Sequence, residues 1–247
     1  MLYNTKASNK QQIVLMYHSI NAAACGEAGA GLYSVSQERF NEQLECIILQ
    51  HRDAIITFDD GHESNYALAY PVLRKLGIKA YFFILVPKVG TPGYMSWEEI
   101  REMSDSGMII GSHGMTHRIL TLLTKEELDW EAAESKRIIE EDLGRPAHFF
   151  SIPRGFNSFR VEESIFAAGY RAVFTSNPND RTNFRYGRIA VKGEWDLEYF
   201  KRVLAGEVPI REKSRKFIIE ASKKVLGARR YDKVREIVLR QQVVGSR

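Results

Sequence analysis

The sequence predicts an α/β fold, with one barrel-like domain of seven strands followed by a basic C-terminal helical extension. Short apolar runs typical of strands alternate seven times with amphipathic helical patterns, and this alternation favours parallel strands joined by helical crossovers. A chain of 247 residues can bury one large core or two small ones. Because we find neither an internal repeat nor a low-complexity linker, the simplest organisation is a single domain over 1–207 with a tail over 208–247.

Each expected strand is a short run of mostly apolar residues. The seven runs are Ile13–Tyr17, Ala54–Phe58, Ala80–Val86, Met108–Gly111, His148–Ile152, Ala172–Thr175 and Arg188–Val191. In barrels of parallel strands, functional groups lie at the C-terminal ends of the strands. Three of these ends carry polar side chains, at His18, at Asp59–Asp60 and at Ser112–His113. These residues are therefore expected on one rim of the barrel.

Between the strands, helices are indicated by apolar periodicity and by capping residues. Gln37–Leu49 places its apolar residues on one helical face. Ser96-Trp-Glu-Glu99 and Thr124-Lys-Glu-Glu127 are capping boxes, the pattern that opens a helix. The second of these helices is expected to run to Leu143, because Gly144 follows it.

The composition is that of a soluble globular protein, with 44% hydrophobic and 27% charged residues. Its two cysteines, Cys25 and Cys46, have neither a disulfide pattern nor metal-ligand spacing. The first residues lack the apolar segment of a signal peptide, and no apolar window is long enough to span a membrane. A cytoplasmic location is therefore expected.

Charge divides the chain into a mildly acidic body and a basic tail. Residues 211–247 hold twelve Lys or Arg against four Asp or Glu, whereas the other 210 residues hold 23 against 27. The acidic balance of the body argues against a nucleic-acid-binding surface. The tail is predicted to be an amphipathic helix with apolar Phe217, Ile218, Ala221, Val225 and Leu226 on one face.

Two interpretations of this tail stay open. The simpler one is a helix packed on the barrel with a solvated cationic face. The other is peripheral contact with an anionic membrane surface, at the inner face of the membrane. The sequence does not indicate an oligomeric state.

Thr57-Phe-Asp-Asp-Gly61 places two carboxylates at the end of an apolar strand. Successive strand residues point to opposite faces, so both aspartates reach one site only if the chain turns there, and Gly61 permits such a turn. This geometry favours Asp60 as a metal ligand and Asp59 as a base, although the residues alone leave the order open. Alone, Asp-Asp-Gly is equally typical of a surface turn.

Ser112-His-Gly-Met-Thr-His117 contains a His-x-x-x-His pair, which on a helical turn brings both imidazoles to one point. Two solvated surface histidines are the alternative. With one Asp, the pair offers three ligands to a divalent cation and leaves a position for water, as in catalytic zinc sites. The pattern predicts a metal-dependent hydrolase, whose second carboxylate is the base for that water.

An amide hydrolase also needs a proton donor for the leaving nitrogen, and histidine titrates in a suitable range. His18, at the end of the first strand, is the first candidate. His62, which follows the Asp-Asp-Gly turn, is the second.

These motifs resemble those of the NodB-homology polysaccharide deacetylases, carbohydrate esterase family four, from about Ile13 to about Val191. The resemblance implies a distorted, TIM-like (β/α) barrel with about seven strands. It implies Asp59 as the catalytic base and Asp60, His113 and His117 as ligands of a divalent metal. Zinc is the first expectation, and cobalt and nickel are the alternatives.

The chain departs from this family in three places, and one of them is that the family's fourth motif, which contains Asp and Trp, is not evident. Many members read Arg-x-Pro-x-Gly in a third motif, where Ser151-Ile-Pro-Arg-Gly155 has serine in place of the arginine that orients the base. This segment still implies a substrate and oxyanion site at Pro153 and Arg154, through the backbone N–H of Arg154. The family's late catalytic histidine is absent, because no histidine follows His148. Leu15-Met-Tyr-His-Ser19 is similar to the early Tyr-His of the branch that acts on poly-N-acetylglucosamine, which implies His18 as the acid.

The implied function is metal-dependent removal of the N-acetyl group from an amino sugar in an oligosaccharide, a polysaccharide such as an exopolysaccharide, or a lipid-linked glycan. Hydrolysis of another C–N bond, in a formamido sugar or a cyclic amide, is an alternative. A decayed, non-catalytic glycan-binding module is a second alternative. A metal-dependent phosphodiesterase is a third, but we find no second cluster of carboxylates. The glycine-rich stretch 26–31 lacks the Lys-Ser/Thr of a phosphate loop and is interpreted as a flexible loop.

Overall fold

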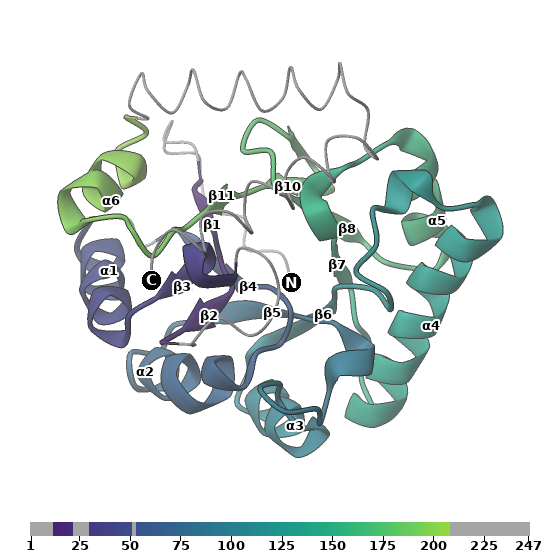
Figure 1. Cartoon of the computed structure of the whole chain (residues 1–247), viewed down its shortest axis with the longest axis horizontal. Coiled ribbons are helices and arrows are strands. Elements are labelled where there is room, and N and C mark those ends of the chain that lie inside the picture. Colours follow the sequence, from purple (N-terminus) through teal and green to yellow (C-terminus); the bar gives the residue numbers. More distant parts are fainter. Residues whose placement is uncertain (1–11, 22–29, 51–52, 208–247) are drawn as a thin grey trace, which may run out of the picture.

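The computed structural model describes residues 12–21, 30–50 and 53–207. They form a curled, mainly parallel sheet in the order β11-β1-β4-β5-β6-β7-β8-β10-β9, with helices around its outside (Figure 1). Its strands are β1 (Val14–Tyr17), β4 (Ile55–Phe58), β5 (Ala80–Ile84), β6 (Ile109–Ser112), β7 (Phe149–Ser151), β8 (Ala172–Thr175), β9 (Arg181–Thr182), β10 (Arg185–Gly187) and β11 (Ile189–Ala190). The predicted α/β barrel-like class is thus confirmed.

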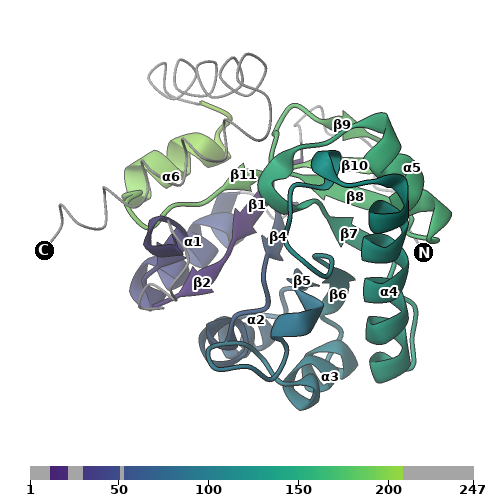
Figure 2. The ribbon, with the colours of Figure 1, turned by 45° about the vertical axis from the view of Figure 1, so that its right-hand side comes forward.

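Helices connect successive strands and cover the outer face of the sheet. The α-helices are α1 (Gln37–Gln50), α2 (Tyr70–Lys75), α3 (Trp97–Asp105), α4 (Lys125–Leu143), α5 (Phe159–Ala167) and α6 (Leu197–Leu204). Shorter helical turns are η1 (Ala30–Tyr33), η2 (Asn65–Ala69), η3 (Val86–Lys88), η4 (Leu120–Leu122) and η5 (Pro153–Gly155). Helix α6 packs against α1, far from α4 and α5 (Figure 2).

The helix boundaries follow the predicted capping residues. Ser96 and Thr124 both form complete capping boxes, at the starts of α3 and α4. Gly144 ends α4 in the left-handed region, at φ 63°. These boundaries are local properties of the sequence, because each cap involves residues within one helical turn.

The last expected strand, Arg188–Val191, is wrong in its extent. Within this range the strand is the shorter β11, which pairs in parallel with β1, and the unpredicted β10 precedes it and pairs in parallel with β8. Arg188 lies between them, where the chain crosses from one end of the curled sheet to the other. A second sheet, in which β2 (Ser19–Ile20) pairs with β3 (Ser34–Val35), was not predicted. Two residues are too few to show an alternating pattern.

The two faces of the curled sheet bury different side chains. On the outer face, Leu15, Ile56 and Phe82 belong to the large core beneath the helices. On the inner face, Val14, Phe83 and Phe174 form a smaller core, because alternate strand residues point inward. Aromatic rings therefore make up much of this inner core.

The predicted basic tail, 208–247, and the stretch around Cys25 lie outside the described residues, so both interpretations of the tail stay predictions. Among the residues described, none of the helices combines the length and the apolar character that crossing a membrane requires. Cys46 is buried and forms no disulfide.

Candidate metal and catalytic site

Asp60, His113 and His117 come together at the C-terminal ends of β4 and β6. One ligand atom from each lies within 4.8 Å of the others. Asp60 Oδ1 is 3.4 Å from Nε2 of His113 and 3.5 Å from Nε2 of His117. The three side chains are 12%, 3% and 17% exposed, respectively. They form one half-buried pocket of two imidazoles and a carboxylate.

The turn after β4 separates the two neighbouring carboxylates. Asp60 has a φ of 74° and Gly61 a φ of 81°, both in the left-handed region. Such a conformation is costly for a residue other than glycine and persists where the surroundings enforce it, often at functional sites. Asp60 faces the two histidines, and Asp59 is buried beside them, with Oδ2 4.0 Å from His113 Nε2.

The donor set fits a divalent metal. Asp60 Oδ1 is buried and has no hydrogen-bond partner among the described residues. His113 Nδ1 lies 2.8 Å from the carbonyl oxygen of Ser151. That contact requires a proton on Nδ1, which leaves the lone pair of Nε2 for a metal. One carboxylate and two imidazoles suit zinc, and also cobalt or nickel.

The two histidines do not lie on a helical turn, as the i, i+4 spacing suggested. Residues 113–117 form a loop after β6, and His117 has a φ of 55°. Both imidazoles nevertheless lie close to Asp60. The prediction of a helical turn is wrong, because tertiary contacts rather than helical hydrogen bonds hold the loop.

Asp59 is bound by an arginine that sequence analysis did not identify. Arg188 donates to both carboxylate oxygens, from Nη1 to Oδ1 at 2.6 Å and from Nη2 to Oδ2 at 2.8 Å. Its guanidinium also lies over the rings of Phe83 and Phe174. Arg188 is 1% exposed and Asp59 is 2% exposed, so this bidentate pair is fully buried.

Ser151 completes this buried group. Its hydroxyl is 3.2 Å from each oxygen of Asp59 and accepts a 2.7 Å hydrogen bond from Arg188 Nη2. Arg188 reaches both Asp59 and Ser151 from the junction between β10 and β11. Arg188 thus makes the contact that the sequence comparison expected from an arginine at position 151.

Electrostatics favours the ionised form of both aspartates. Burial by itself would raise the pKa of Asp59, but the charge and hydrogen bonds of Arg188, with His113, lower it below the ordinary value. Burial likewise opposes ionisation of Asp60, yet contacts with His62 and the neighbouring histidines hold its pKa well below the ordinary value. Burial lowers the pKa of His117 to about 4, so this imidazole is neutral at pH 7 and available as a ligand.

The two candidates for the proton donor lie in different surroundings. The ring of His18 stacks on Tyr33 at 4.8 Å, and Asn65 Nδ2 donates to the His18 carbonyl at 2.7 Å. His62 Nε2 lies 3.6 Å from Asp60 Oδ2, and its ring stacks on Tyr94. His62 therefore contacts a candidate metal ligand, whereas His18 lies directly after the C-terminal end of β1.

Arg154 lies beside the cluster, on the turn η5 after buried Pro153. It has a φ of 61°, and is thus a third residue other than glycine near the site in the left-handed region, after Asp60 and His117. Arg154 and His117 line the same hollow, which has a volume of about 430 Å³. Its remaining lining residues include apolar Leu85, Met115 and Ile119. This hollow is the candidate place for a substrate.

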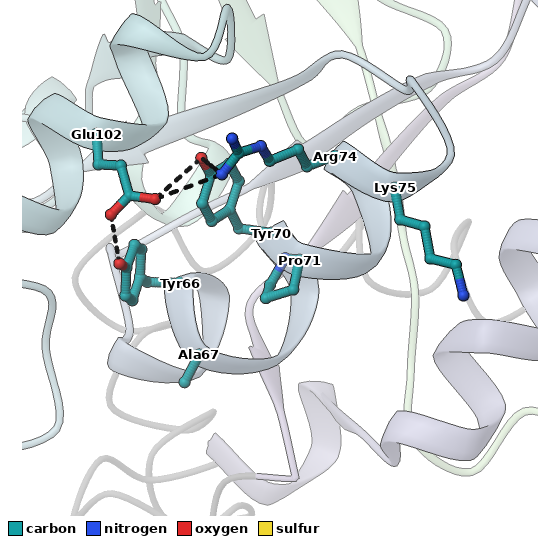
Figure 3. Close-up of a pocket in the computed structure, with 7 residues that line it drawn as sticks. All are labelled: Tyr66, Ala67, Tyr70, Pro71, Arg74, Lys75 and Glu102. Atoms are coloured by element: carbon teal, nitrogen blue, oxygen red, sulfur yellow. Dashed lines mark hydrogen bonds and ion pairs between the residues drawn. The ribbon is translucent and has the colours of Figure 1, made fainter.

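A larger hollow of about 520 Å³ lies elsewhere, between α2 and α3 (Figure 3). Its polar groups bind one another: Tyr66 donates to Glu102 at 2.6 Å, and Tyr70 donates to the same carboxylate at 3.3 Å. Arg74 lies 3.7 Å from Glu102. Because these groups are already paired and none belongs to the cluster, we do not assign catalysis to this hollow.

Comparison with known proteins agrees with this geometry. A family model described as polysaccharide deacetylase matches residues 49–173. The Bacillus subtilis protein YxkH is 33% identical over 124 residues, which are 50% of this chain and 44% of that protein. The peptidoglycan-N-acetylglucosamine deacetylase of Bacillus cereus is 28% identical over 132 residues, 52% of this chain and 60% of that protein. The chain thus spans about half the length of these curated relatives.

The fold is shared with a solved structure. IcaB from Ammonifex degensii superposes with a TM-score of 0.64 at 24% identity, over 80% of this chain and 97% of that chain. The family match includes Asp59, Asp60 and both histidines of the cluster, but neither His18 nor Arg188. Because the matching model covers half of the chain and its fold agrees, this chain belongs to the polysaccharide deacetylase family.

Proposed function

We propose that this chain is a metal-dependent deacetylase that removes the N-acetyl group from an amino sugar of a polysaccharide, oligosaccharide or lipid-linked glycan. The observation that carries the proposal is the three-ligand cluster of Asp60, His113 and His117 beside a second, ionised carboxylate. Asp59 Oδ2 lies 4.0 Å from His113 Nε2, so the base faces the ligands. A bound divalent ion, with zinc as the first candidate, would polarise the acetyl carbonyl and acidify a water.

The protein groups divide the proton transfers between them. Asp59 accepts a proton from the attacking water, while Arg188 and Ser151 fix its orientation. The backbone N–H of Arg154 donates to the developing oxyanion. His18 donates a proton to the leaving nitrogen, giving acetate and a free amine. Asp59 gains one proton and His18 loses one in each turnover, so transfer of one proton from Asp59 to His18 through solvent returns both groups to their starting states.

The non-catalytic alternative is weakened by Arg188. Two departures from the family pattern favoured a decayed site, and one was the missing arginine beside the base. Arg188 makes that contact from another part of the chain. A decayed site has no need for a bidentate pair that costs desolvation of two charges.

Acetate release from N-acetylglucosamine oligomers by metal-stripped protein, with and without added zinc or cobalt, tests the proposal. We expect one equivalent of metal to bind and release to depend on it, and we expect His113→Ala to lose both. Metal binding without acetate release from oligomers, peptidoglycan or lipid-linked glycans would favour hydrolysis of another C–N bond. A folded chain that binds no metal would favour the glycan-binding module.

The two histidine candidates are separated by a pair of variants. His18→Ala is expected to lower kcat by ~10²–10⁴-fold, the usual contribution of a general acid, with unchanged metal affinity. His62→Ala is expected to weaken metal binding instead, because His62 faces Asp60 at 3.6 Å. Steady-state kinetics and metal titration of both variants provide the measurement. The opposite pattern would assign the acid role to His62.

A further inference from the structure

One carboxylate on α4 holds the loop that carries both candidate metal histidines. Glu131 Oε2 accepts hydrogen bonds from the backbone N–H of Met115 at 2.6 Å and of Thr116 at 3.2 Å. Its other oxygen, Oε1, accepts from the hydroxyl of Thr116. Glu131 is 1% exposed, so a buried carboxylate accepts from a loop whose Thr116 is itself exposed.

The two backbone donors lie midway between His113 and His117. In a helix, their N–H groups would bind carbonyl oxygens four residues earlier, but this segment is a loop. A buried N–H without an acceptor costs about 1–3 kcal/mol, so an external acceptor determines which loop conformation is stable. Glu131 is that acceptor.

Gly114 makes the close approach of the carboxylate feasible. It has a φ of 81°, and a Cβ atom there would lie 2.8 Å from Glu131 Oε2. The glycine between the two histidines therefore serves both the left-handed turn and the space for Glu131.

A second attachment joins the same turn of α4 to the start of the loop. Ser112 Oγ donates to Ser135 Oγ at 2.8 Å and accepts from the Gly114 N–H at 2.9 Å. Ser135 in turn donates to the carbonyl oxygen of Glu131 at 2.6 Å. One helical turn thus contacts the loop through several hydrogen bonds in succession.

We propose that Glu131 is a positioning residue of the metal site, which acts on His113 and His117 through its hydrogen bonds to the loop rather than through its charge. All three donors to Glu131 are uncharged groups. This inference rests on the proposed metal dependence. Groups that orient metal ligands typically change metal affinity ~10–100-fold when mutated.

Two substitutions separate hydrogen bonding from charge. Glu131→Gln removes the charge but keeps an oxygen that can accept from the two backbone N–H groups. Its zinc affinity is therefore expected to stay within ~3-fold of wild type, well under the ~10–100-fold loss that follows when a group that orients metal ligands is disturbed. Glu131→Asp keeps the charge but is one methylene too short, and zinc affinity is expected to fall ~10–100-fold. Zinc affinity is measured by chelator competition, which needs no substrate. Glu141→Gln, on the exposed face of the same helix, is the matched control.

Hydrogen exchange of the Met115 and Thr116 amides provides a readout without metal. Protection is expected in wild type and in Glu131→Gln, and its loss is expected in Glu131→Asp. Thr116→Val is the substitute if the Glu131→Asp variant does not fold. It removes one of the three donors to Glu131, at an exposed position. Zinc affinity is expected to fall several-fold, which is less than when all three hydrogen bonds are disturbed.

The proposal would be overturned if the wild type and Glu131→Asp bind zinc with equal affinity. If Glu131→Asp does not fold, it would be overturned by a Thr116→Val variant with the zinc affinity of the wild type. A Gln variant as weak as Asp would overturn it in favour of a charge effect. A wild-type chain that binds no zinc while its amides are protected by Glu131 would contradict the proposed function, and would leave Glu131 a loop support without a role at a metal.

Discussion

Asp59→Asn is expected to keep the metal affinity of the wild type and to lower kcat by ~10²–10⁴-fold, the usual loss when a general base is removed. Asparagine cannot accept the proton of water, whereas the ligand atoms of Asp60, His113 and His117 are untouched. Metal titration and acetate release on the same preparation provide the measurement. Asp60→Asn should show the reverse order of effects, with loss of metal binding first.

The stability of the Asp59 variant must be measured beside its activity. Asparagine leaves the guanidinium of Arg188, which is 1% exposed, without its anionic partner. Breaking a buried ion pair from one side typically costs about 3–5 kcal/mol. Kinetics should therefore be recorded well below the melting temperature of the variant. Full turnover by folded Asp59→Asn protein would exclude Asp59 as the base.

The candidate metal cluster could be predicted from sequence because its members are of ligand type and follow recognisable strands. Asp60 ends one apolar run, and His113 ends the run after the next. Parallel strands bring their C-terminal ends to one edge, so the sequence order alone predicts proximity. The conformation of the histidine loop could not be predicted in this way, because Glu131 on the following helix determines it.

Arg188 escaped prediction for a different physical reason. It is 129 residues from Asp59 along the chain, at the junction between β10 and β11, where the apolar pattern indicates the start of a strand. An arginine is almost never fully buried unless it is paired, and its place at the start of an expected strand does not identify a partner. The available signal was the serine at position 151, because a missing partner for a buried carboxylate requires a cation from elsewhere. That signal predicts the need for an arginine but does not say which one.

Arg188→Met is expected to have the second large effect, through Asp59. Without the guanidinium, burial is the main influence on the Asp59 carboxyl, and burial raises its pKa. The base works only when it is ionised, so activity falls as pH drops through this pKa. The acid limb of the kcat/KM profile should therefore move to higher pH than in the wild type.

The charge and the geometry of Arg188 are separated by a second variant. Arg188→Lys keeps a positive charge but cannot make two parallel hydrogen bonds to Asp59. Its acid limb should lie between those of wild type and Arg188→Met, with a lower kcat because the base is less well oriented. Metal affinity should be unchanged in both variants, since the hydrogen bonds of Arg188 go to Asp59, Ser151, Thr57 and Thr175 rather than to the ligands.

Arg185→Met is the matched control for these measurements, because Arg185 lies three residues away and also pairs with a buried carboxylate. Arg185 Nε is 2.7 Å from Glu162, whose side chain is 6% exposed. Losing this pair should lower the melting temperature without moving the pH profile, because Glu162 is not at the site. A shift of the acid limb in Arg185→Met equal to that in Arg188→Met would show that general destabilisation moves the profile. If the acid limb of the kcat/KM profile moves in neither Arg185→Met nor Arg188→Met, then Arg188 does not lower the pKa of Asp59, and the prediction is wrong.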